Sequence, residues 1–326
     1  MPLSDSIFSI KTTAEFESSV LETFHFQAKE NPVYRQYLEN LHKQVSGIKK
    51  MEDIPFLPIE FFKTQTVVSG ELKPEIIFTS SGTTGMATSQ HYVSELSIYE
   101  ESFLKGFEIF YGPVNQFCIL ALLPSYLERQ GSSLIYMMDS LIKKSNHPDS
   151  GFYLNNLDEL VDKLEKLEQE GQKTLLMGVS FALLDLAEKY KLELHQTIVM
   201  ETGGMKGRRK EITREELHSV LKEKLGVSGI HSEYGMTELL SQAYSKGEGR
   251  YYCPPWMKVI IRDPYDPFAC LQRGRSGGIN IIDLANRYSC AFIETKDLGK
   301  INPDGSFEVL GRMDNSDLRG CNLLVI

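Results

Sequence analysis

A run of hydroxyl and glycine residues follows an apolar segment early in the chain. The stretch FTSSGTTGMATSQ occupies residues 78–90, directly after Ile76 and Ile77. Consecutive backbone N–H groups in a glycine-containing loop form a nest for anionic oxygens, and Ser and Thr hydroxyls add further donors. The Walker spacing G-x-x-x-x-G-K-[ST] is absent, so we predict a phosphate-binding loop of another type, with a solvent-exposed turn as the alternative. The loop residues are Ser80, Ser81, Gly82, Thr83, Thr84 and Gly85.

Four later segments place acidic, aromatic or hydroxyl residues beside glycine. They are ETGG (residues 201–204), SEYGMTE (232–238), ETKDLG (294–299) and GRMDNSD (311–317). Taken singly, each has an ordinary structural explanation, such as a surface acid, a half-buried tyrosine or a turn. Their chemistry becomes specific only when all five segments are considered together and in order.

In this order the five segments resemble the signature segments of the acyl-adenylate-forming enzymes, the superfamily of acyl-CoA synthetases, firefly luciferase and peptide-synthetase adenylation domains. A narrower similarity, to the LuxE-type acyl-protein synthetases of bacterial bioluminescence, runs almost end to end. It is carried by NPVYRQYLENL, IPFLPIEFFK and the terminal RGCNLLV. The resemblance implies an α/β fold, the large N-terminal-type domain of these enzymes, with packed α/β sheets and a small β-rich subdomain. We expect residues 1–326 to form a single core, 275–326 to be its β-rich subdomain, and the separate C-terminal lid domain to be absent.

The resemblance also implies which residues bind the nucleotide. The loop hydroxyls and glycines would hold the triphosphate, Tyr234 would stack on adenine, and Asp297 and Arg312 would bind the ribose. The complete nucleotide-binding set is Ser80, Ser81, Gly82, Thr83, Thr84, Gly85, Gly203, Gly204, Glu233, Tyr234, Gly235, Asp297 and Arg312.

Three residues would take part in catalysis by the same resemblance. Thr237 would contact the α-phosphate, and Glu238 would bind Mg²⁺, a hard cation that prefers carboxylate and phosphate oxygens. Cys321 would accept the acyl group as a thiolate, which the neighbouring Arg319 favours electrostatically. Its structural alternative is a small apolar residue beside Leu323.

The function so implied is ATP- and Mg²⁺-dependent activation of a carboxylic acid, with a fatty acid expected, as acyl-AMP. The acyl group would then pass to a thiol, either Cys321 or a partner protein such as a reductase. One alternative is an acyl- or aryl-CoA ligase of the phenylacetate type. Another is a non-catalytic nucleotide-binding subunit of an acyl-transfer complex.

The sequence departs from the superfamily pattern at two basic positions. After GTTG the usual Pro-Lys-Gly is replaced by residues 86–89, Met-Ala-Thr-Ser, so one lysine is missing, and the lid lysine is missing if the lid is absent. Compensation by Lys206, Arg208 and Arg209 is one expectation. Lys296 stands where the family has glycine.

Composition restricts the partners. The formal charge of −9 disfavours a nucleic-acid surface, since phosphate neutralisation requires clustered Lys and Arg. Five scattered cysteines without C-x-x-C spacing favour reduced thiols. Neither a signal peptide nor a membrane span is recognisable, so we expect a cytoplasmic protein. Phe78, Tyr126 and Phe181 are candidates for an acyl pocket or the core, and His91 and His231 for the pocket or buried positions.

The elements that must position these segments follow a strand–turn–helix pattern. Residues 117–124, 173–180 and 195–204 contain apolar runs of strand length, each followed by helical sequence. Leucines and a valine between Leu154 and Leu167 share one helical face, and Thr213 with Glu216 forms a capping box. The alternation predicts a mostly parallel α/β sheet, whereas the short β-like pieces beyond Gly274 predict the β-rich subdomain.

Overall fold

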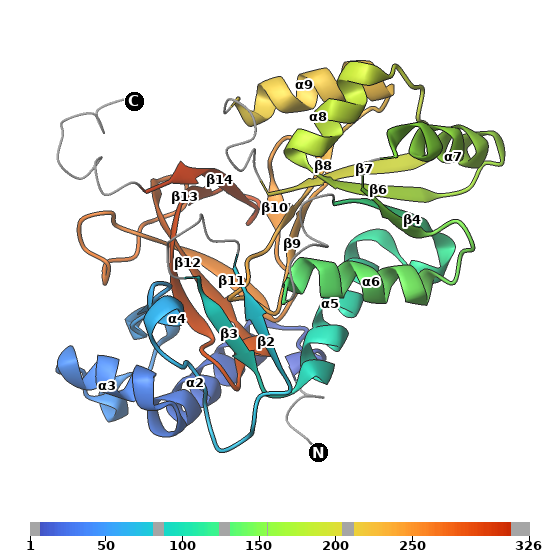
Figure 1. Ribbon diagram of the computed structural model, residues 1–326. Helices are drawn as coiled ribbons and strands as arrows, with labels where there is room; N and C mark the ends of the chain where they lie inside the picture. The colour runs from blue at the N-terminus through green and yellow to red at the C-terminus, as the bar shows by residue number, and fades with distance from the viewer. Residues whose placement is uncertain (1–6, 81–87, 124–130, 155, 204–211, 314–326) are drawn as a thin grey trace. The chain divides into compact units, whose positions relative to one another are not determined.

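The computed structural model describes residues 7–80, 88–123, 131–154, 156–203 and 212–313. These residues form two compact units (Figure 1). Unit 1 comprises the described residues of Met1–Ile98, Glu238–Leu240 and Tyr252–Ile326, and unit 2 those of Tyr99–Thr237 and Ser241–Tyr251. Both units are therefore built from segments that are separate in the sequence.

The sheet of unit 2 has the predicted parallel character. Its strands are β4 (Cys118–Leu122), β5 (Gly151–Tyr153), β6 (Thr174–Val179), β7 (Thr197–Thr202), β8 (His231–Tyr234) and β9 (Ala243–Ser245). The order is β9-β8-β7-β6-β4-β5, and only the β8–β9 pair in it is antiparallel. Every residue of β4 and β6 is buried, as expected for parallel strands covered on both faces.

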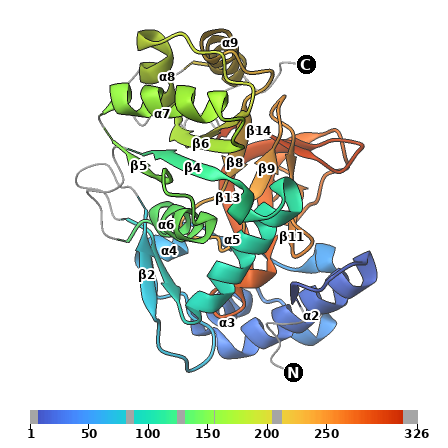
Figure 2. The same cartoon turned by 90° about the vertical axis from the view of Figure 1, so that its right-hand side faces the viewer.

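Helices cover both faces of this sheet, with α7, α8 and α9 on one face and α5 and α6 on the other (Figures 1 and 2). Their bounds are α5 (Leu96–Tyr111, whose first three residues belong to unit 1), α6 (Ser133–Ser145), α7 (Leu157–Gln169), α8 (Ser180–Lys189) and α9 (Arg214–Leu225), and a 3₁₀ turn, η3, spans Val114–Gln116. The predicted capping box is confirmed: Thr213 and Glu216 bond each other's backbone N–H groups at the start of α9. Of the predicted stripe, Leu160, Val161, Leu164 and Leu167 are buried on α7, whereas Leu154 precedes the helix.

Unit 1 is built around an antiparallel sheet. Its strands are β11 (Met257–Arg262), β12 (Ser276–Asp283), β13 (Phe292–Ile301) and β14 (Phe307–Arg312), paired in that order, with the short β1 (Leu57–Pro58) parallel to β13. A separate hairpin pairs β2 (Ile76–Thr79) with β3 (Gln90–Val93). The two-residue β10 (Tyr251–Tyr252) contains the boundary between the units.

The helices of unit 1 are α2 (Thr13–Glu30), α3 (Pro32–Asn40), α4 (Phe61–Thr64) and the 3₁₀ turns η1 (Val45–Gly47), η2 (Met51–Asp53) and η4 (Leu284–Asn286). Aromatic and amide side chains attach α2 and α3 to β13 and to the residues just before it. The buried rings of Phe24 and Tyr34 contact Phe292 with centroid distances of 6.1 Å each. The fully buried Gln27 amide donates to the carbonyls of Asn286 and Arg287 and accepts from the Ala291 N–H. These contacts join the first helices to residues near the other end of the sequence.

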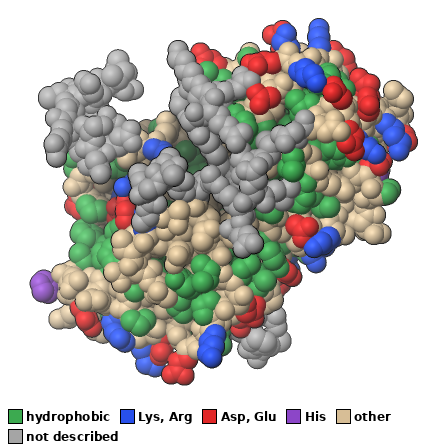
Figure 3. Space-filling view, in the orientation of Figure 1, with side chains coloured by type: hydrophobic (Ala, Val, Ile, Leu, Met, Phe, Trp, Pro, Cys, Tyr) green, Lys and Arg blue, Asp and Glu red, His purple; other side chains and the backbone are tan. Residues whose placement is uncertain are grey.

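The charged side chains on the face drawn in Figure 3 are interspersed, with Lys and Arg beside Asp and Glu. No helix in the described part of the chain is long and apolar enough to cross a membrane.

Candidate functional site

The two ends of the predicted phosphate loop are held together at the loop end of the β2–β3 hairpin, just after β2 and just before β3. The Ser80 N–H donates to the Ser89 carbonyl at 3.1 Å, and the Ser89 N–H donates to the Ser80 hydroxyl at 2.9 Å. Residues Ser81, Gly82, Thr83, Thr84 and Gly85 lie outside the described residues. The hairpin therefore presents Ser80 and Ser89 as the two anchors of the loop between them.

Glu238 lies in the same unit and contacts one of these anchors. Its carboxylate is buried, with 5% of the residue exposed, and it accepts a hydrogen bond from the Ser89 hydroxyl. Burial raises the pKa of Glu238, while the Ser89 hydrogen bond and the charges of Lys63 and Arg312 lower it in part. The Asn286 amide holds the Glu238 carbonyl at 2.8 Å. A buried carboxylate with nearby cationic groups thus lies beside the base of the predicted loop.

Lys63 reaches this neighbourhood because α4 packs on β3. The Phe62 ring is 1% exposed and meets the His91 ring edge-on, with centroids 5.7 Å apart. Lys63 is the next residue and is exposed, so its charge acts on Glu238 from the surface. The buried position of His91 also shows that this histidine is part of the packing of unit 1.

Asp297 and Arg312 are cross-strand neighbours on β13 and β14. Their Cα atoms are paired, and Arg312 Nε lies 3.7 Å from Asp297 Oδ1. The Asp297 side chain is 16% exposed and that of Arg312 is 77% exposed. The fold thus brings together the two residues predicted to bind a ribose. Lys296, between Thr295 and Asp297, forms an ion pair with Glu60 of the segment that precedes α4.

In unit 2 the ends of β7 and β8 carry two buried carboxylates. Glu201 accepts a hydrogen bond from Ser180 at 3.1 Å and lies 3.7 Å from His218 Nε2. Although burial opposes it, His218 and hydrogen bonds from Ser232 and Ser180 lower the pKa of Glu201. Burial and the Glu201 charge together raise the pKa of Glu233 to about 7, against the lowering effect of the Thr202 hydrogen bond. One carboxylate is therefore held as an anion, and its neighbour titrates near neutral pH.

The other predicted site residues described in unit 2 are Gly203, Tyr234, Gly235 and Thr237. The half-buried Tyr234 contacts Tyr251, with ring centroids 5.9 Å apart. Gly203 has φ of +61°, the left-handed region that suits glycine. A Cβ on Gly235 would lie 2.4 Å from a Glu233 carboxylate oxygen, so only glycine fits there without a shift of Glu233. Thr237 is half-buried.

His231, on β8, is a half-buried histidine with a defined partner. Its Nδ1 lies 3.2 Å from the Tyr111 hydroxyl, and burial together with the Lys246 charge lowers the pKa of His231 to about 4. The ring is therefore neutral at neutral pH, as a packing residue of unit 2. Phe181, an acyl-pocket or core candidate, is 2% exposed on α8, and Phe78 is fully buried on β2.

The predicted residues thus form two groups, one in each unit. Ser80, Glu238, Asp297 and Arg312 belong to unit 1, whereas Gly203, Glu233, Tyr234, Gly235 and Thr237 belong to unit 2. Gly204, Tyr126, Lys206, Arg208, Arg209 and Cys321 lie outside the described residues. No role was predicted from the sequence for Ser89, Lys63 and Thr202. Ser89 had a signal in its closeness to the loop, but the other two are single residues without a motif.

Two solved structures of larger ligases show which fold the chain has. ATP-bound MatB from Rhodopseudomonas palustris is 19% identical, with a TM-score of 0.55 over 72% of this chain and 47% of MatB. An open conformation of 2-hydroxyisobutyryl-CoA ligase in complex with 2-HIB-AMP and CoA is 12% identical, with a TM-score of 0.70 over 97% of this chain and 75% of that ligase. The chain thus spans about half the length of MatB and has the α/β fold of the acyl-CoA ligases, as predicted.

The family follows from the sequence match. Residues 8–326 match the acyl-protein synthetase family LuxE, and the chain belongs to this family. A search among curated proteins gave no significant match.

Proposed function

We propose that the protein activates a carboxylic acid as acyl-AMP at the expense of ATP and transfers the acyl group to a thiol. Membership of the acyl-protein synthetase family and the ligase fold support this proposal. The observation that carries it is the hydrogen bond between Ser89 and Glu238, because it ties the predicted magnesium ligand to the base of the predicted phosphate loop.

In the first step, a carboxylate oxygen of the acid would form a bond to the α-phosphorus of ATP. The bond between that phosphorus and the bridging oxygen would break, and pyrophosphate would leave with the electron pair. Ser81, Thr83 and Thr84 with the loop glycines would bind the triphosphate, and Thr237 would contact the α-phosphate. Donors fixed before the reaction stabilise the developing charge most effectively.

The described residues fit a magnesium ion held mainly by phosphate oxygens. No group of three or more His, Cys, Asp or Glu side chains that could hold a metal occurs within the described ranges. Mg²⁺ in nucleotide sites is commonly bound by one or two carboxylates together with phosphates and water, so Glu238 suffices as the protein ligand. The ion would neutralise phosphate charge, and Glu238 must lose its proton to bind it. Lys63 and Arg312 favour that loss through their charges.

The roles of the nucleoside-binding residues follow from the family resemblance. Tyr234 would stack on adenine beside Gly203 and Gly204. Gly203 has a left-handed backbone conformation, and at Gly235 a Cβ would collide with Glu233, so glycine suits both positions. Glu233 is placed in this set by its motif. Asp297 would accept hydrogen bonds from the ribose hydroxyls, and Arg312 would support the same sugar.

In the second step, the Cys321 thiolate would attack the acyl carbonyl carbon, and AMP would leave. The proposed substrate is a fatty acid. After Cys321, the acyl group would pass to a partner protein such as a reductase. The proposed location of the protein is the cytoplasm. Transfer to CoA, as in a phenylacetate-type ligase, is the alternative to Cys321. A nucleotide-binding subunit without catalysis is the alternative to both.

Labelled pyrophosphate exchange into ATP tests the first step, with a panel of fatty and aryl acids and Mg²⁺. We expect exchange with at least one fatty acid and its loss in Glu238→Gln. ATP binding without exchange for any acid would support the non-catalytic subunit instead. If added CoA is acylated faster than Cys321, the result would support a CoA ligase.

A further inference from the structure

The ladder between β12 and β13 is interrupted beside Asp297. Gly278 pairs with Leu298, but Asn280 pairs with Glu294, so four residue steps along β13 face two along β12. The three residues Thr295–Asp297 therefore have only Ile279 opposite them. A bulge of this kind bends a strand and redirects its side chains, and it leaves backbone groups without ladder partners. Such buried groups must find other partners.

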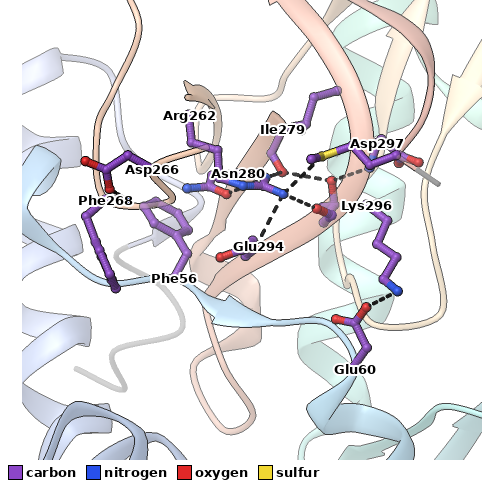
Figure 4. A network of polar contacts seen from close by, with 12 residues as sticks. Phe56, Glu60, Arg262, Asp266, Phe268, Ile279, Asn280, Glu294, Lys296 and Asp297 are labelled. Carbon is purple, nitrogen blue, oxygen red and sulfur yellow. Dashed lines mark hydrogen bonds and ion pairs between the residues drawn. The ribbon is translucent and has the colours of Figure 1, made fainter. Parts of the chain in front are cut away.

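Arg262 of β11 provides those partners. The residue is 4% exposed, and its Nη1 donates to the Ile279 carbonyl at 3.0 Å and to Asn280 Oδ1 at 2.9 Å. Its Nη2 donates to the Thr295 carbonyl at 2.8 Å. Figure 4 shows the guanidinium between these groups of β12 and β13. The carbonyls on both sides of the bulge are thus bonded to one side chain.

Two short connections lead from this guanidinium to Asp297. The Thr295 hydroxyl donates to the Ile279 carbonyl at 2.8 Å and accepts from the Asp297 N–H at 3.1 Å. The Met313 N–H donates to the Lys296 carbonyl at 2.7 Å, and Arg262 Nη2 lies 3.5 Å from Met313 Sδ. The N–H and the C=O of the peptide bond between Lys296 and Asp297 are therefore both held by groups that Arg262 contacts.

The hydrogen-bond donors of Arg262, rather than its charge, account for its presence at this position. A buried guanidinium is expensive to desolvate, and its ion-pair partner Glu294, 3.4 Å away, is itself largely buried. Apolar residues of similar volume often replace buried ion pairs without loss of stability. The sheet also leaves space for this side chain, because a Cβ on Gly278 would lie 2.4 Å from Arg262 Cζ. What an apolar residue cannot provide is the set of donors that shapes the bulge.

We propose that Arg262 is a positioning residue that sets the bulge from which Asp297 binds the ribose hydroxyls, an inference that rests on the proposed function. Arg262 touches no substrate atom itself. It acts on the direction of the Asp297 carboxylate, so its loss impairs recognition of the sugar hydroxyls and leaves contacts with the base and phosphates in place.

Calorimetric titration with ATP and with 2′,3′-dideoxyATP, both with Mg²⁺, tests this separation. A hydrogen bond to a charged group contributes on the order of tenfold in affinity, so the wild type should favour ATP by at least about that factor. In Arg262→Lys and Arg262→Met we expect the ratio of the two affinities to fall towards one, with dideoxyATP binding unchanged. A merely structural role would weaken both nucleotides equally and preserve the ratio.

Three further variants make the result decisive. Asp297→Asn should abolish the preference, and Arg287→Lys, a change at another largely buried arginine of unit 1, should retain it. If the Arg262 variants do not fold, Thr295→Val removes only the hydroxyl that holds the Asp297 N–H, and it should also lose the preference. If the folded Arg262 variants still prefer ATP over dideoxyATP, the inference is overturned and the proposed function stays intact. If those variants do not fold, the same outcome in Thr295→Val has the same meaning. If the wild type binds both nucleotides equally, the inference is overturned. If the wild type binds neither nucleotide, both the inference and the proposed function are contradicted.

Discussion

Thr202 and Glu233 lie opposite each other on β7 and β8, and the Thr202 hydroxyl donates a 2.6 Å hydrogen bond to the buried Glu233 carboxylate. This bond does not fully offset the burial of the charge, so the pKa of Glu233 is raised to about 7. The strand ends of unit 2 therefore carry a carboxylate whose protonation changes around neutral pH. Its effect on the free energy of unfolding can be measured separately from any activity.

Replacing Glu233 by Gln should stabilise the protein at alkaline pH. A carboxyl with a raised pKa in the folded state contributes stability that is complete below its unfolded pKa, near 4.5, and is lost as the pH rises through about 7. Gln keeps an acceptor for Thr202 and carries no charge. The shift corresponds to a stability difference on the order of 3 kcal/mol at pH 8, fading towards pH 4. Urea unfolding of wild type and Glu233→Gln at both pH values measures it. Glu165→Gln, at an exposed acid on α7, is the control. If the free energies of unfolding of wild type and Glu233→Gln depend on pH in parallel, the prediction is contradicted.

Removing the Ser89 hydroxyl should change the pH profile of pyrophosphate exchange. Activity should fall as the pH drops, because protonation of Glu238 removes the metal ligand. Burial already raises the pKa of Glu238, and the Ser89 hydrogen bond lowers it, so Ser89→Ala raises it further. We expect the acid limb of the profile to move to higher pH, with the rate restored at alkaline pH. Ser94→Ala, at another buried serine just beyond β3, is the matched control and should leave the limb in place. An unmoved limb in Ser89→Ala would count against Glu238 as the titrating group.

An alanine at position 278 should destabilise unit 1. Its Cβ would lie 2.4 Å from Arg262 Cζ and 2.6 Å from Nη1, and that guanidinium is held by several hydrogen bonds. Overpacking of this kind typically costs about 1–3 kcal/mol. Gly47→Ala is the control, since no heavy atom lies within 4 Å of its added Cβ. Denaturant unfolding of both variants checks the difference, and equal stabilities would show that Arg262 can move aside without loss.

Acylation should occur at Cys321 and at none of the four described cysteines. Burial raises the pKa of the Cys118 thiol to about 11 and those of Cys253 and Cys290 to about 12. Cys270 is exposed, but partial burial and the acids nearby raise its pKa as well. The thiolate is the nucleophile, so these thiols react slowly at neutral pH.

Mass spectrometry of the protein after incubation with ATP, Mg²⁺ and a fatty acid locates the thioester. We expect it on the peptide that contains Cys321. The adduct should disappear in Cys321→Ser and persist in Cys270→Ser, the control at the exposed thiol. An adduct that survives Cys321→Ser would exclude that residue as the acceptor.

The sequence was sufficient for the repetitive parts of the fold, where many residues carry the same signal. The apolar runs around β4 and β6 have strand length and predict buried strands, and the Thr213–Glu216 pair defines a helix start through local hydrogen bonds. Asp297 and Arg312 were predicted to share a ligand, and their cross-strand pairing places them together. The ligase fold was predicted from motif order and the LuxE family from three further segments, and comparison confirmed both.

The residues that support the site could not be predicted in the same way. Arg262 and Thr295 are 33 positions apart in the sequence, and their contact exists only because β11, β12 and β13 pair with a shifted register. Local propensity contains no information on such a register. Ser89 and Glu238, almost 150 positions apart, meet for a similar reason. The roles assigned to the motif residues stay predictions until nucleotide binding is measured.

The attachment of α2 and α3 to β13 has a consequence during synthesis. Phe24 and Tyr34 leave the ribosome long before Phe292, the residue that covers them in the finished protein. Unit 2, built almost entirely from one continuous stretch, can form in the interval, whereas the first helices must wait with apolar rings uncovered. The nascent chain should therefore be most prone to chaperone capture while residues 13–40 lack their partner strand.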